Sequence, residues 1–247
     1  MEKDFYLQYA SVEDKHWWFV ARRQIIEKVI QRLNLPQNAQ ILEAGCGTGG
    51  NLQMLSRHGQ VSAMELEEVA CQLANQRQVT QVKRGSLPDN IPFSLQYDLI
   101  LILDVIEHLD DDLSALKALY YKLKPGGYLL ITVPAYRFLW SEHDDINHHK
   151  RRYRLKGLKQ VVKKAGYELN YSSYFNTFLF PVVAIVRVLA KLLPKQNNNQ
   201  ISSDLVVPSK PVNHILKLLF ASERYLIDKF TLPFGVSVLL LARKPNS

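Results

Sequence analysis

Two short segments contain the residue types that can move a proton. One is residues 104–108 (DVIEH), and the other is residues 140–153, which include His143, Asp144 and His148. An imidazole titrates near neutral pH and is therefore the natural base for taking a proton from a hydroxyl group. We predict His143 as the base, with His148 as the second candidate and Asp144 orienting one of the two.

A glycine-dense turn could bind a nucleotide-like ligand. Residues 40–52 (QILEAGCGTGGNL) begin as an apolar run that ends at Glu43 and continue as Gly45-x-Gly47-x-Gly49. Glycine permits positive φ and close approach of the backbone to a ligand. A strand-to-helix turn at the carboxyl edge of a parallel sheet is where α/β folds bind nucleotides. The spacing differs from that of dinucleotide sites and of P-loops, and no lysine follows to hold a phosphate.

Three later segments place this turn in a known family. With Glu43 before the glycines, the turn resembles motif I of the class I S-adenosylmethionine (SAM) methyltransferases. Residues 61–65 (VSAME), 97–109 (YDLILILDVIEHL) and 123–134 (LKPGGYLLITVP) resemble later motifs in the same order. The chain is therefore identified as a class I SAM-dependent methyltransferase, similar to type 11 and quinone-biosynthesis enzymes. The resemblance implies SAM as cofactor and S-adenosyl-L-homocysteine as product.

The resemblance also implies the cofactor contacts. Glu43 would take the SAM ammonium group, Glu65 the ribose hydroxyls, and Leu66 would lie against the adenine. Ser86 stands where the family often has an acidic residue for the adenine amine. The other expected contacts are Gly45, Cys46, Gly47, Thr48, Gly49, Leu87, Leu103, Asp104 and Val105.

A metal-dependent variant would use the same two segments. The D-x-x-E-H pattern plus a later histidine resembles the metal site of small-RNA 2′-O-methyltransferases and some quinone O-methyltransferases. It would hold a divalent ion through Asp104, Glu107, His108 and His143. Such an ion would bind the acceptor oxygens and lower their pKa. Because many relatives keep Glu-His there without metal, we do not expect a divalent metal.

Alternating strands and helices must position these residues. Such alternation with continuous apolar strands predicts a parallel sheet covered on both faces. The resemblance implies an α/β Rossmann-like fold: a seven-stranded, mostly parallel sheet of order 3-2-1-4-5-7-6, with the last strand antiparallel, helices on both faces and an N-terminal helical lid. We predict strands near 40–44, 61–65, 80–84, 98–103, 128–134, 167–175 and 236–242, and helices near 16–33, 50–57, 67–76, 111–123, 155–165, 178–195 and 214–230.

We expect a single SAM methyltransferase domain over residues 1–247. Its parts would be an N-terminal helical segment (1–36), a core (37–175), a helical insertion (176–233) and the last strand (234–247). In related methyltransferases an N-terminal segment often closes over the cofactor. The aromatic head of the first helix, which includes both tryptophans of the pair at 17–18, could instead dock that helix on the sheet.

Charge is distributed unevenly along the chain. Residues 1–149 carry 14 Lys+Arg and 19 Asp+Glu (net −5), whereas residues 150–247 carry 17 and 4 (net +13), which together give +8. In the insertion, Arg187, Lys191 and Lys195 recur every four residues within an apolar run. The run is shorter than the roughly 20 residues that span a bilayer. This helix would suit either a membrane interface or the protein core.

Three functions remain open on these observations. They are methyl transfer to a small or lipid-like acceptor, with oxygen the favoured atom; RNA methylation, suggested by the basic run 150–154; and a SAM-fold protein that only binds a membrane or partner. The basic half and the apolar insertion favour a lipid-like acceptor and an anionic membrane surface over nucleic acid. Cys46 and Cys71 form no disulfide framework and no signal peptide begins the chain, so we expect a cytoplasmic protein, with the inner membrane face as a peripheral site. The oligomeric state stays open.

Overall fold

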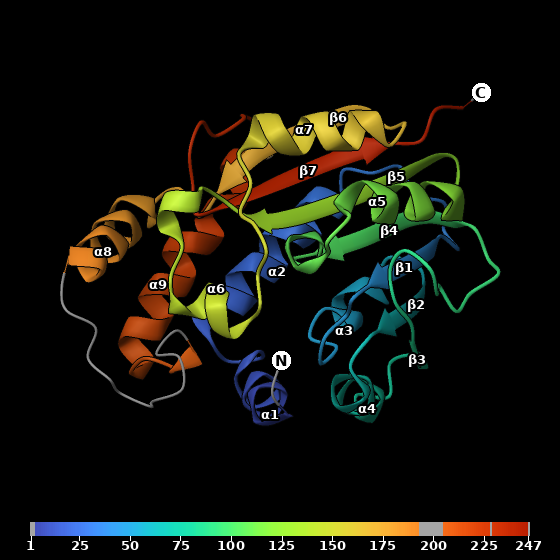
Figure 1. Cartoon of the computed structure of the whole chain (residues 1–247). Coiled ribbons are helices and arrows are strands. Elements are labelled where there is room, and N and C mark those ends of the chain that lie inside the picture. Colours follow the sequence, from blue (N-terminus) through green and yellow to red (C-terminus); the bar gives the residue numbers. More distant parts are fainter. Residues whose placement is uncertain (1–2, 193–204, 228, 247) are drawn as a thin grey trace.

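A seven-stranded sheet forms the centre of the molecule (Figure 1). The computed structural model describes residues 3–192, 205–227 and 229–246. The strand order β3-β2-β1-β4-β5-β7-β6 confirms the prediction from the sequence. The strands are β1 Gln40–Ala44, β2 Gln60–Glu65, β3 Val82–Arg84, β4 Tyr97–Leu103, β5 Leu123–Pro134, β6 Glu168–Phe175 and β7 Ser237–Arg243.

The pairing directions bring the carboxyl ends of the first five strands to one edge of the sheet. β1 pairs in parallel with β2 and β4, β2 with β3, and β4 with β5, whereas β7 pairs antiparallel with both β5 and β6. Every residue of β4 except Asp98 is buried, which requires cover on both faces. The loops after β1, β2, β4 and β5 therefore lie next to one another and can build a shared site.

Helices cover both faces of the sheet (Figure 1). On one face α5 and α7 contribute buried residues such as Leu116 and Leu158; on the other, α2 and α9 contribute Ile25 and Phe220. The helices are α1 Lys3–Val12, α2 Trp17–Ile30, α3 Leu52–Leu55, α4 Glu68–Gln76, α5 Asp112–Lys122, α6 Glu142–Ile146, α7 Leu155–Lys164, α8 Phe180–Leu192, α9 Lys210–Ser222 and α10 Arg224–Ile227, with short 3₁₀ helices η1 Ile106–His108 and η2 Arg137–Leu139.

The helix predicted over residues 214–230 has the wrong bounds. α9 begins earlier, at Lys210, and a separate short helix, α10, follows Glu223. The buried carboxylate of Glu223 accepts hydrogen bonds from the backbone N–H groups of Thr177 and Phe178 at 2.6 and 2.9 Å. This contact, between residues more than 40 positions apart, fixes the chain at the junction of the two helices. Helices α1 and α6 were not predicted.

The helix predicted over 178–195 is α8, which begins at Phe180. Lys195, the third residue of the predicted basic stripe, lies outside the described residues. Within residues 3–192, 205–227 and 229–246, no helix combines the length and the apolar character needed to cross a bilayer.

Candidate active site

The glycine loop after β1 is shaped for close approach of a ligand. Gly45 and Gly47 have φ angles of +78° and +55°, which residues with a side chain rarely adopt. A Cβ at Gly45 would lie 2.6 Å from Val105 Cγ2, whereas a Cβ at Gly47 would meet no atom within 4 Å. Gly45 is therefore required for packing, while the backbone at Gly47 borders open space.

Glu43 lies at the carboxyl end of β1, at the base of this loop. Its Oε1 accepts a hydrogen bond from Asn51 Nδ2 at 2.7 Å, and its buried Oε2 has no hydrogen-bond partner. Burial raises the pKa of Glu43 to about 7, against the opposing effect of the Asn51 hydrogen bond. A half-satisfied buried acid is costly unless a ligand completes it. A cationic group such as an ammonium would fit this position.

Glu65 ends β2 and faces the same loop. Its Oε2 accepts from Gly47 N at 2.8 Å, and its Oε1 accepts from the N–H groups of Leu66 and Glu67 at 2.8 and 3.1 Å. Burial raises the pKa of Glu65, and these three hydrogen bonds oppose that effect. A carboxylate offers about four acceptor positions. Accepting both ribose hydroxyls, as the resemblance implied, would therefore require this carboxylate to release one of its backbone partners.

One cavity of about 790 Å³ joins the predicted cofactor and acceptor residues. This volume is in the upper part of the range of about 300–1,000 Å³ that is common for ligand pockets. Gly49 is the one predicted cofactor residue outside the lining; its Cβ would pack against Arg77, Leu52 and Ala74. The cofactor residues in the lining are Glu43, Gly45, Cys46, Gly47, Thr48, Glu65, Leu66, Ser86, Leu87, Leu103, Asp104 and Val105.

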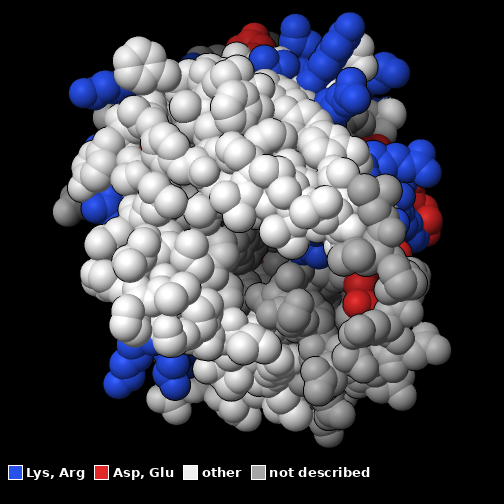
Figure 2. All heavy atoms as spheres, turned by 90° about the vertical axis from the view of Figure 1, so that its left-hand side faces the viewer, with Lys and Arg blue, Asp and Glu red and all other residues white. Residues whose placement is uncertain are grey.

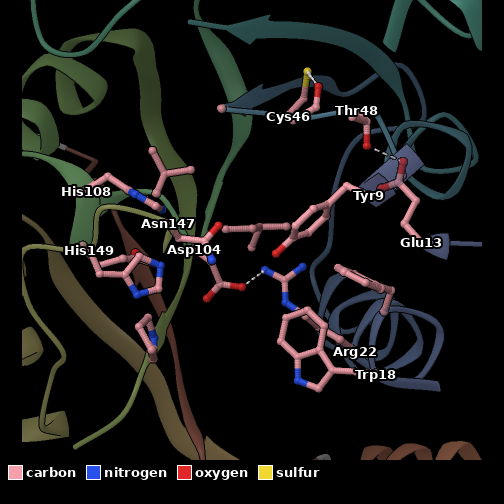
Figure 3. A pocket seen from close by; sticks show the side chains of 18 of the residues that line it. Tyr9, Glu13, Trp18, Arg22, Cys46, Thr48, Asp104, His108, Asn147 and His149 are labelled. Atoms are coloured by element: carbon pink, nitrogen blue, oxygen red, sulfur yellow. Dashed lines mark hydrogen bonds and ion pairs between the residues drawn. The ribbon is translucent and has the colours of Figure 1, made fainter. Parts of the chain in front are cut away.

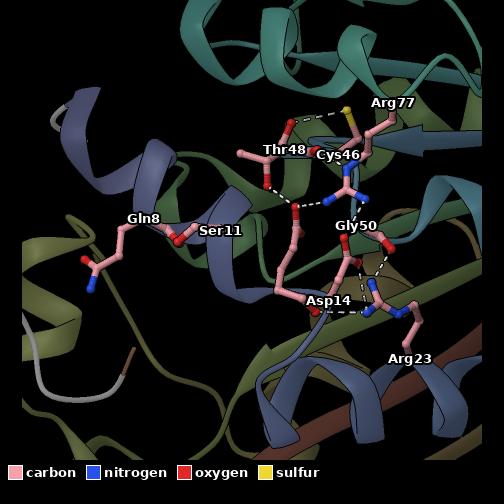
Figure 4. A network of polar contacts seen from close by, with 10 residues as sticks. Gln8, Ser11, Asp14, Arg23, Cys46, Thr48, Gly50 and Arg77 are labelled. Atoms are coloured by element: carbon pink, nitrogen blue, oxygen red, sulfur yellow. Dashed lines mark hydrogen bonds and ion pairs between the residues drawn. The ribbon is translucent and has the colours of Figure 1, made fainter. Parts of the chain in front are cut away.

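An ionic network ties the N-terminal segment to the glycine loop (Figure 4). The Glu13 carboxylate accepts from the Thr48 hydroxyl and from Arg77 Nη2, both at 2.5 Å, and Arg77 Nε donates to the Thr48 carbonyl at 2.7 Å. Arg23 donates to the carbonyls of Gly50 and Glu13. The segment that joins α1 to α2 therefore closes one side of the cavity.

Arg22 extends from α2 to the middle of the cavity. Its Nη2 lies 2.5 Å from Asp104 Oδ2, and its guanidinium carbon lies 5.2 Å from the centre of the Trp18 ring. Figure 3 shows Asp104 between this pair and the imidazoles of His108 and His149. The Asp104 carboxylate is therefore already engaged by a buried cation.

Asp144 contacts His149, a partner that the sequence analysis did not propose. Its Oδ1 lies 2.8 Å from His149 Nδ1, and its two oxygens accept from Arg152 Nε and Nη2 at 2.7 and 2.9 Å. Burial alone would raise the pKa of Asp144, but the hydrogen bonds from His149 and Arg152 hold it well below its ordinary value. With Nδ1 facing the carboxylate, His149 keeps Nε2 for another partner.

Glu107, His108 and His149 form a compact group whose ligand-type atoms lie within 4.8 Å of one another. Neither carboxylate oxygen of the buried Glu107 has a hydrogen-bond partner, and burial, reinforced by the charge of Asp104, raises its pKa well above the ordinary value. Burial and the adjacent His149 lower the pKa of His108 to about 4, so this imidazole is neutral at physiological pH. This group shares Glu107 and His108 with the metal set suggested by the sequence and contains His149, whereas Asp104 of that set is paired with Arg22.

The two histidines predicted as bases line the same part of the cavity as His149. The His143 and His149 rings lie 6.2 Å apart between centroids, and His148 is exposed with a φ of +54°. The sequence reasoning missed His149 as the partner of Asp144. The spacing Ser141-x-x-Asp144 is that of a capping box, which the structure confirms at the start of α6, but it does not indicate which histidine Asp144 contacts.

The basic run 150–154 serves internal contacts. Arg151 donates to the backbone carbonyls of residues 109 and 110 at 2.9 and 2.8 Å, and Arg152 binds Asp144. These cations hold the loop after β5 against the loop after β4. Two of the three arginines in the run that suggested a nucleic-acid surface are therefore engaged internally, while Arg154 is exposed.

Comparison with known proteins gives the same assignment as the loop geometry. A family model described as a methyltransferase domain matches residues 18–172. The chain belongs to this family. It is 24% identical over 164 residues to a probable S-adenosylmethionine-dependent methyltransferase of Mycolicibacterium smegmatis, covering 64% of this chain and 62% of that protein. It is 28% identical over 103 residues to a ubiquinone biosynthesis O-methyltransferase of Pseudomonas entomophila, covering 38% and 43%. The chain thus spans less than two thirds of these relatives.

Solved methyltransferase structures share the fold. A putative methyltransferase of Haloferax volcanii, in complex with the Trm112 methyltransferase activator, superposes with a TM-score of 0.64 at 15% identity, over 99% of this chain and 96% of that one. Phosphoethanolamine N-methyltransferase 2 of Haemonchus contortus, in complex with SAM, gives 0.58 at 17% identity, over 90% and 52%. At such identities the likeness concerns the Rossmann-like methyltransferase fold alone.

Proposed function

We propose that this methyltransferase-family chain transfers a methyl group from SAM to an oxygen of a small or lipid-like acceptor. The observation that carries the proposal is the single cavity, which has the glycine loop at one end and the group of Glu107, His108 and His149 at the other. Its volume of about 790 Å³ lies in the upper part of the range that is common for ligand pockets. Two reactants could therefore meet inside it, which is the main requirement of a direct transfer.

The chain's own groups fit the cofactor. SAM supplies an activated methyl group when bound. The unpartnered Oε2 of Glu43 would take the ammonium, the open backbone at Gly47 would border the amino acid portion, and Glu65 would accept from the ribose. Leu66, which is 53% exposed and lines the cavity, would cover the adenine. S-adenosyl-L-homocysteine would leave as product.

His149 is the base that we assign to the acceptor hydroxyl. Asp144 holds its Nδ1 at 2.8 Å and so presents Nε2 as the proton acceptor, and the charge of Asp144 would stabilise the imidazolium that forms. Arg152 in turn fixes both oxygens of Asp144. His143 and His148 remain alternatives, since both line this end of the cavity.

A divalent cation in the same place is the second arrangement. The two unpartnered oxygens of buried Glu107, with His108 and His149, would offer one carboxylate and two imidazoles. A cation there would bind the acceptor oxygen and lower its pKa. If this is correct, treatment with a chelator abolishes methyl transfer and added Mg²⁺ or Mn²⁺ restores it. If the chelator has no effect, the metal arrangement is wrong and the base assignment stands.

The charge distribution and the relatives support a small or lipid-like acceptor. Curated relatives include a ubiquinone biosynthesis O-methyltransferase and a phosphoethanolamine N-methyltransferase of Zea mays, 27% identical over 138 residues, or 51% of this chain and 26% of that protein. With Arg151 and Arg152 of the basic run engaged internally, RNA becomes the weaker alternative. We infer a cytoplasmic enzyme that meets its acceptor at the inner membrane surface, with the +13 half of the chain facing anionic lipid.

Methyl transfer from labelled SAM to cell extract tests the proposal. The extract is separated afterwards into lipid, small-molecule, RNA and protein fractions. Label in the lipid or small-molecule fraction, lost in His149→Ala by about 10²–10⁴-fold with SAM affinity unchanged, supports it. Parallel His143→Ala and His148→Ala variants identify the base, because only the variant that lacks the base should lose methyl-transfer activity. Label in RNA alone would favour the RNA alternative, and SAM binding without any transfer would leave a non-enzymatic protein.

A further inference from the structure

Helices α8 and α9 present an exposed apolar face. It consists of Val182, Ile185, Val186 and Leu189 on α8 and Ile215 and Leu218 on α9, each more than half exposed. Monomeric soluble proteins rarely expose contiguous apolar patches beyond a few hundred Å², and larger patches mark interaction sites. We call these six residues the apolar face.

The spacing of the exposed residues on α8 shows that they share one side of the helix. Residues 182, 185, 186 and 189 follow the i, i+3, i+4, i+7 pattern of a single helical stripe. Val183 and Arg187 belong to a neighbouring stripe and line the cavity. One side of α8 therefore borders the cavity, while another is turned to the surroundings.

The charged residues within α8 and α9 have one sign. The sequences of α8 and α9 contain Arg187, Lys191, Lys210 and Lys217 and no acidic residue. Figure 2 shows this side of the molecule as a broad area without charged side chains and with a hollow near its centre; Lys and Arg predominate at its margins, where some Asp and Glu are also seen. An apolar surface with a basic margin complements a bilayer whose headgroups are anionic.

The cavity reaches the same side of the molecule. Besides Val183 and Arg187 of α8, its lining includes Leu205, Val206 and Pro208 from the segment before α9. An acceptor dissolved in a membrane could therefore enter between α8 and residues 205–208 without crossing water. For a lipid-like molecule this avoids the cost of exposing its apolar part to water.

We propose that the apolar face binds the surface of an anionic membrane and that the acceptor passes from the bilayer into the cavity between α8 and residues 205–208. The second half rests on the proposed methyl transfer, whereas the first half does not. The binding is interfacial, because no described helix could span the bilayer. The basic margin makes it sensitive to salt.

Vesicle flotation tests the docking directly. Phosphatidylcholine vesicles with and without about one third phosphatidylglycerol are mixed with wild type, with Ile185→Glu/Leu218→Glu, and with Leu95→Glu. Leu95 is 50% exposed but lies in the loop before β4, so it is the matched control. We expect wild type and Leu95→Glu to float with the anionic vesicles, less at high salt, and the double variant to bind at least about tenfold more weakly, because a charge is expensive in the apolar layer.

A single introduced cysteine reports the location of the contact. Cys46 and Cys71 are the chain's two cysteines and both are buried, so Ile185→Cys can be labelled with a polarity-sensitive dye. The emission of this label should shift to shorter wavelength on anionic vesicles, while a label at Leu95→Cys should not respond.

The outcomes separate the two proposals. Absence of vesicle binding by wild type, with methyl transfer intact, overturns the docking and leaves the enzyme assignment standing. A dimer in sedimentation that Ile185→Glu/Leu218→Glu dissociates, again without vesicle binding, also overturns it, since a second copy then covers the face. Vesicle binding together with the dye shift supports the docking even if no extract fraction accepts the methyl group, a result that counts only against the proposed function.

Discussion

Replacing Glu43 with glutamine should change how the stability of the ligand-free protein depends on pH. The Glu43 side chain is almost fully buried, accepts one hydrogen bond from Asn51 and leaves Oε2 without a partner. Burial raises its pKa from the ordinary value of 4.5 to about 7. The folded protein therefore holds this proton more tightly than the unfolded chain does.

The sign and size of the effect follow from this difference. Between pH 4.5 and pH 7 the unfolded chain has released the proton and the folded protein still holds it, so the free energy of unfolding falls as pH rises. With about 1.4 kcal/mol for each pKa unit, a shift of roughly 2.5 units corresponds to a loss of about 3 kcal/mol, complete above pH 7. Glutamine keeps the shape and does not ionise, so this loss should disappear.

Urea denaturation at pH 5 and pH 8 measures the effect. The wild type should lose about 2.5 kcal/mol more between the two pH values than Glu43→Gln does, since a small part of the loss has already occurred at pH 5. Glu68→Gln, which removes an exposed carboxylate, serves as the control and should behave as wild type. If wild type and Glu43→Gln differ by less than about 1 kcal/mol in this comparison, the argument from burial is wrong.

The same carboxylate links cofactor binding to proton release. An ammonium beside Glu43 favours the ionised form, so binding SAM at pH 6 should release close to one proton from the wild type and none from Glu43→Gln. Calorimetry in two buffers with different ionisation enthalpies measures this number. Tight SAM binding by the wild type without proton release would contradict the assignment of Glu43 to the ammonium group.

Three further predictions concern the glycine loop and the N-terminal segment. Gly47→Leu should fold with a penalty of about 1–2 kcal/mol for its positive φ and bind no SAM in calorimetry, whereas Gly45→Ala, whose Cβ would overlap a neighbouring side chain, should chiefly lower the melting temperature. Glu13→Gln should weaken the ionic network, so proteolysis of the chain before α2 should be faster than in the wild type, and SAM should protect this variant less. Equal cleavage rates in wild type and variant would show that the network does not hold the segment. In Trp140→Phe, the emission of the tryptophan pair at 17–18, which lines the cavity, should change on SAM binding, and an unchanged spectrum would argue against a lid.

The parts of the fold that the sequence predicted depend on short-range patterns. The apolar strands and the glycine turn after Glu43 are each encoded within about a dozen residues, and the family resemblance supplied the strand order. The pairing of Asp144 with His149 could not be read in this way, because three histidines (143, 148 and 149) lie within five residues of that acid and only the packed loop decides between them. Arg22 was also missed, since a charged residue in an apolar helix is expected to face solvent. Here its partner, Asp104, is supplied by a strand end more than 80 residues away.

The position of β7 has a consequence for the order in which the chain folds. In β7, Val238 pairs with Val133 of β5 and with Tyr174 of β6. β5 and β6, which are synthesised first, are therefore joined only through β7, which is synthesised last. During synthesis β5 and β6 therefore each keep an unpaired edge while the roughly sixty residues between β6 and β7 emerge from the ribosome. Such an edge can recruit another nascent chain. We therefore expect a chaperone that binds unpaired strand edges to stay bound to this nascent chain longest in the interval before residues 237–243 are synthesised.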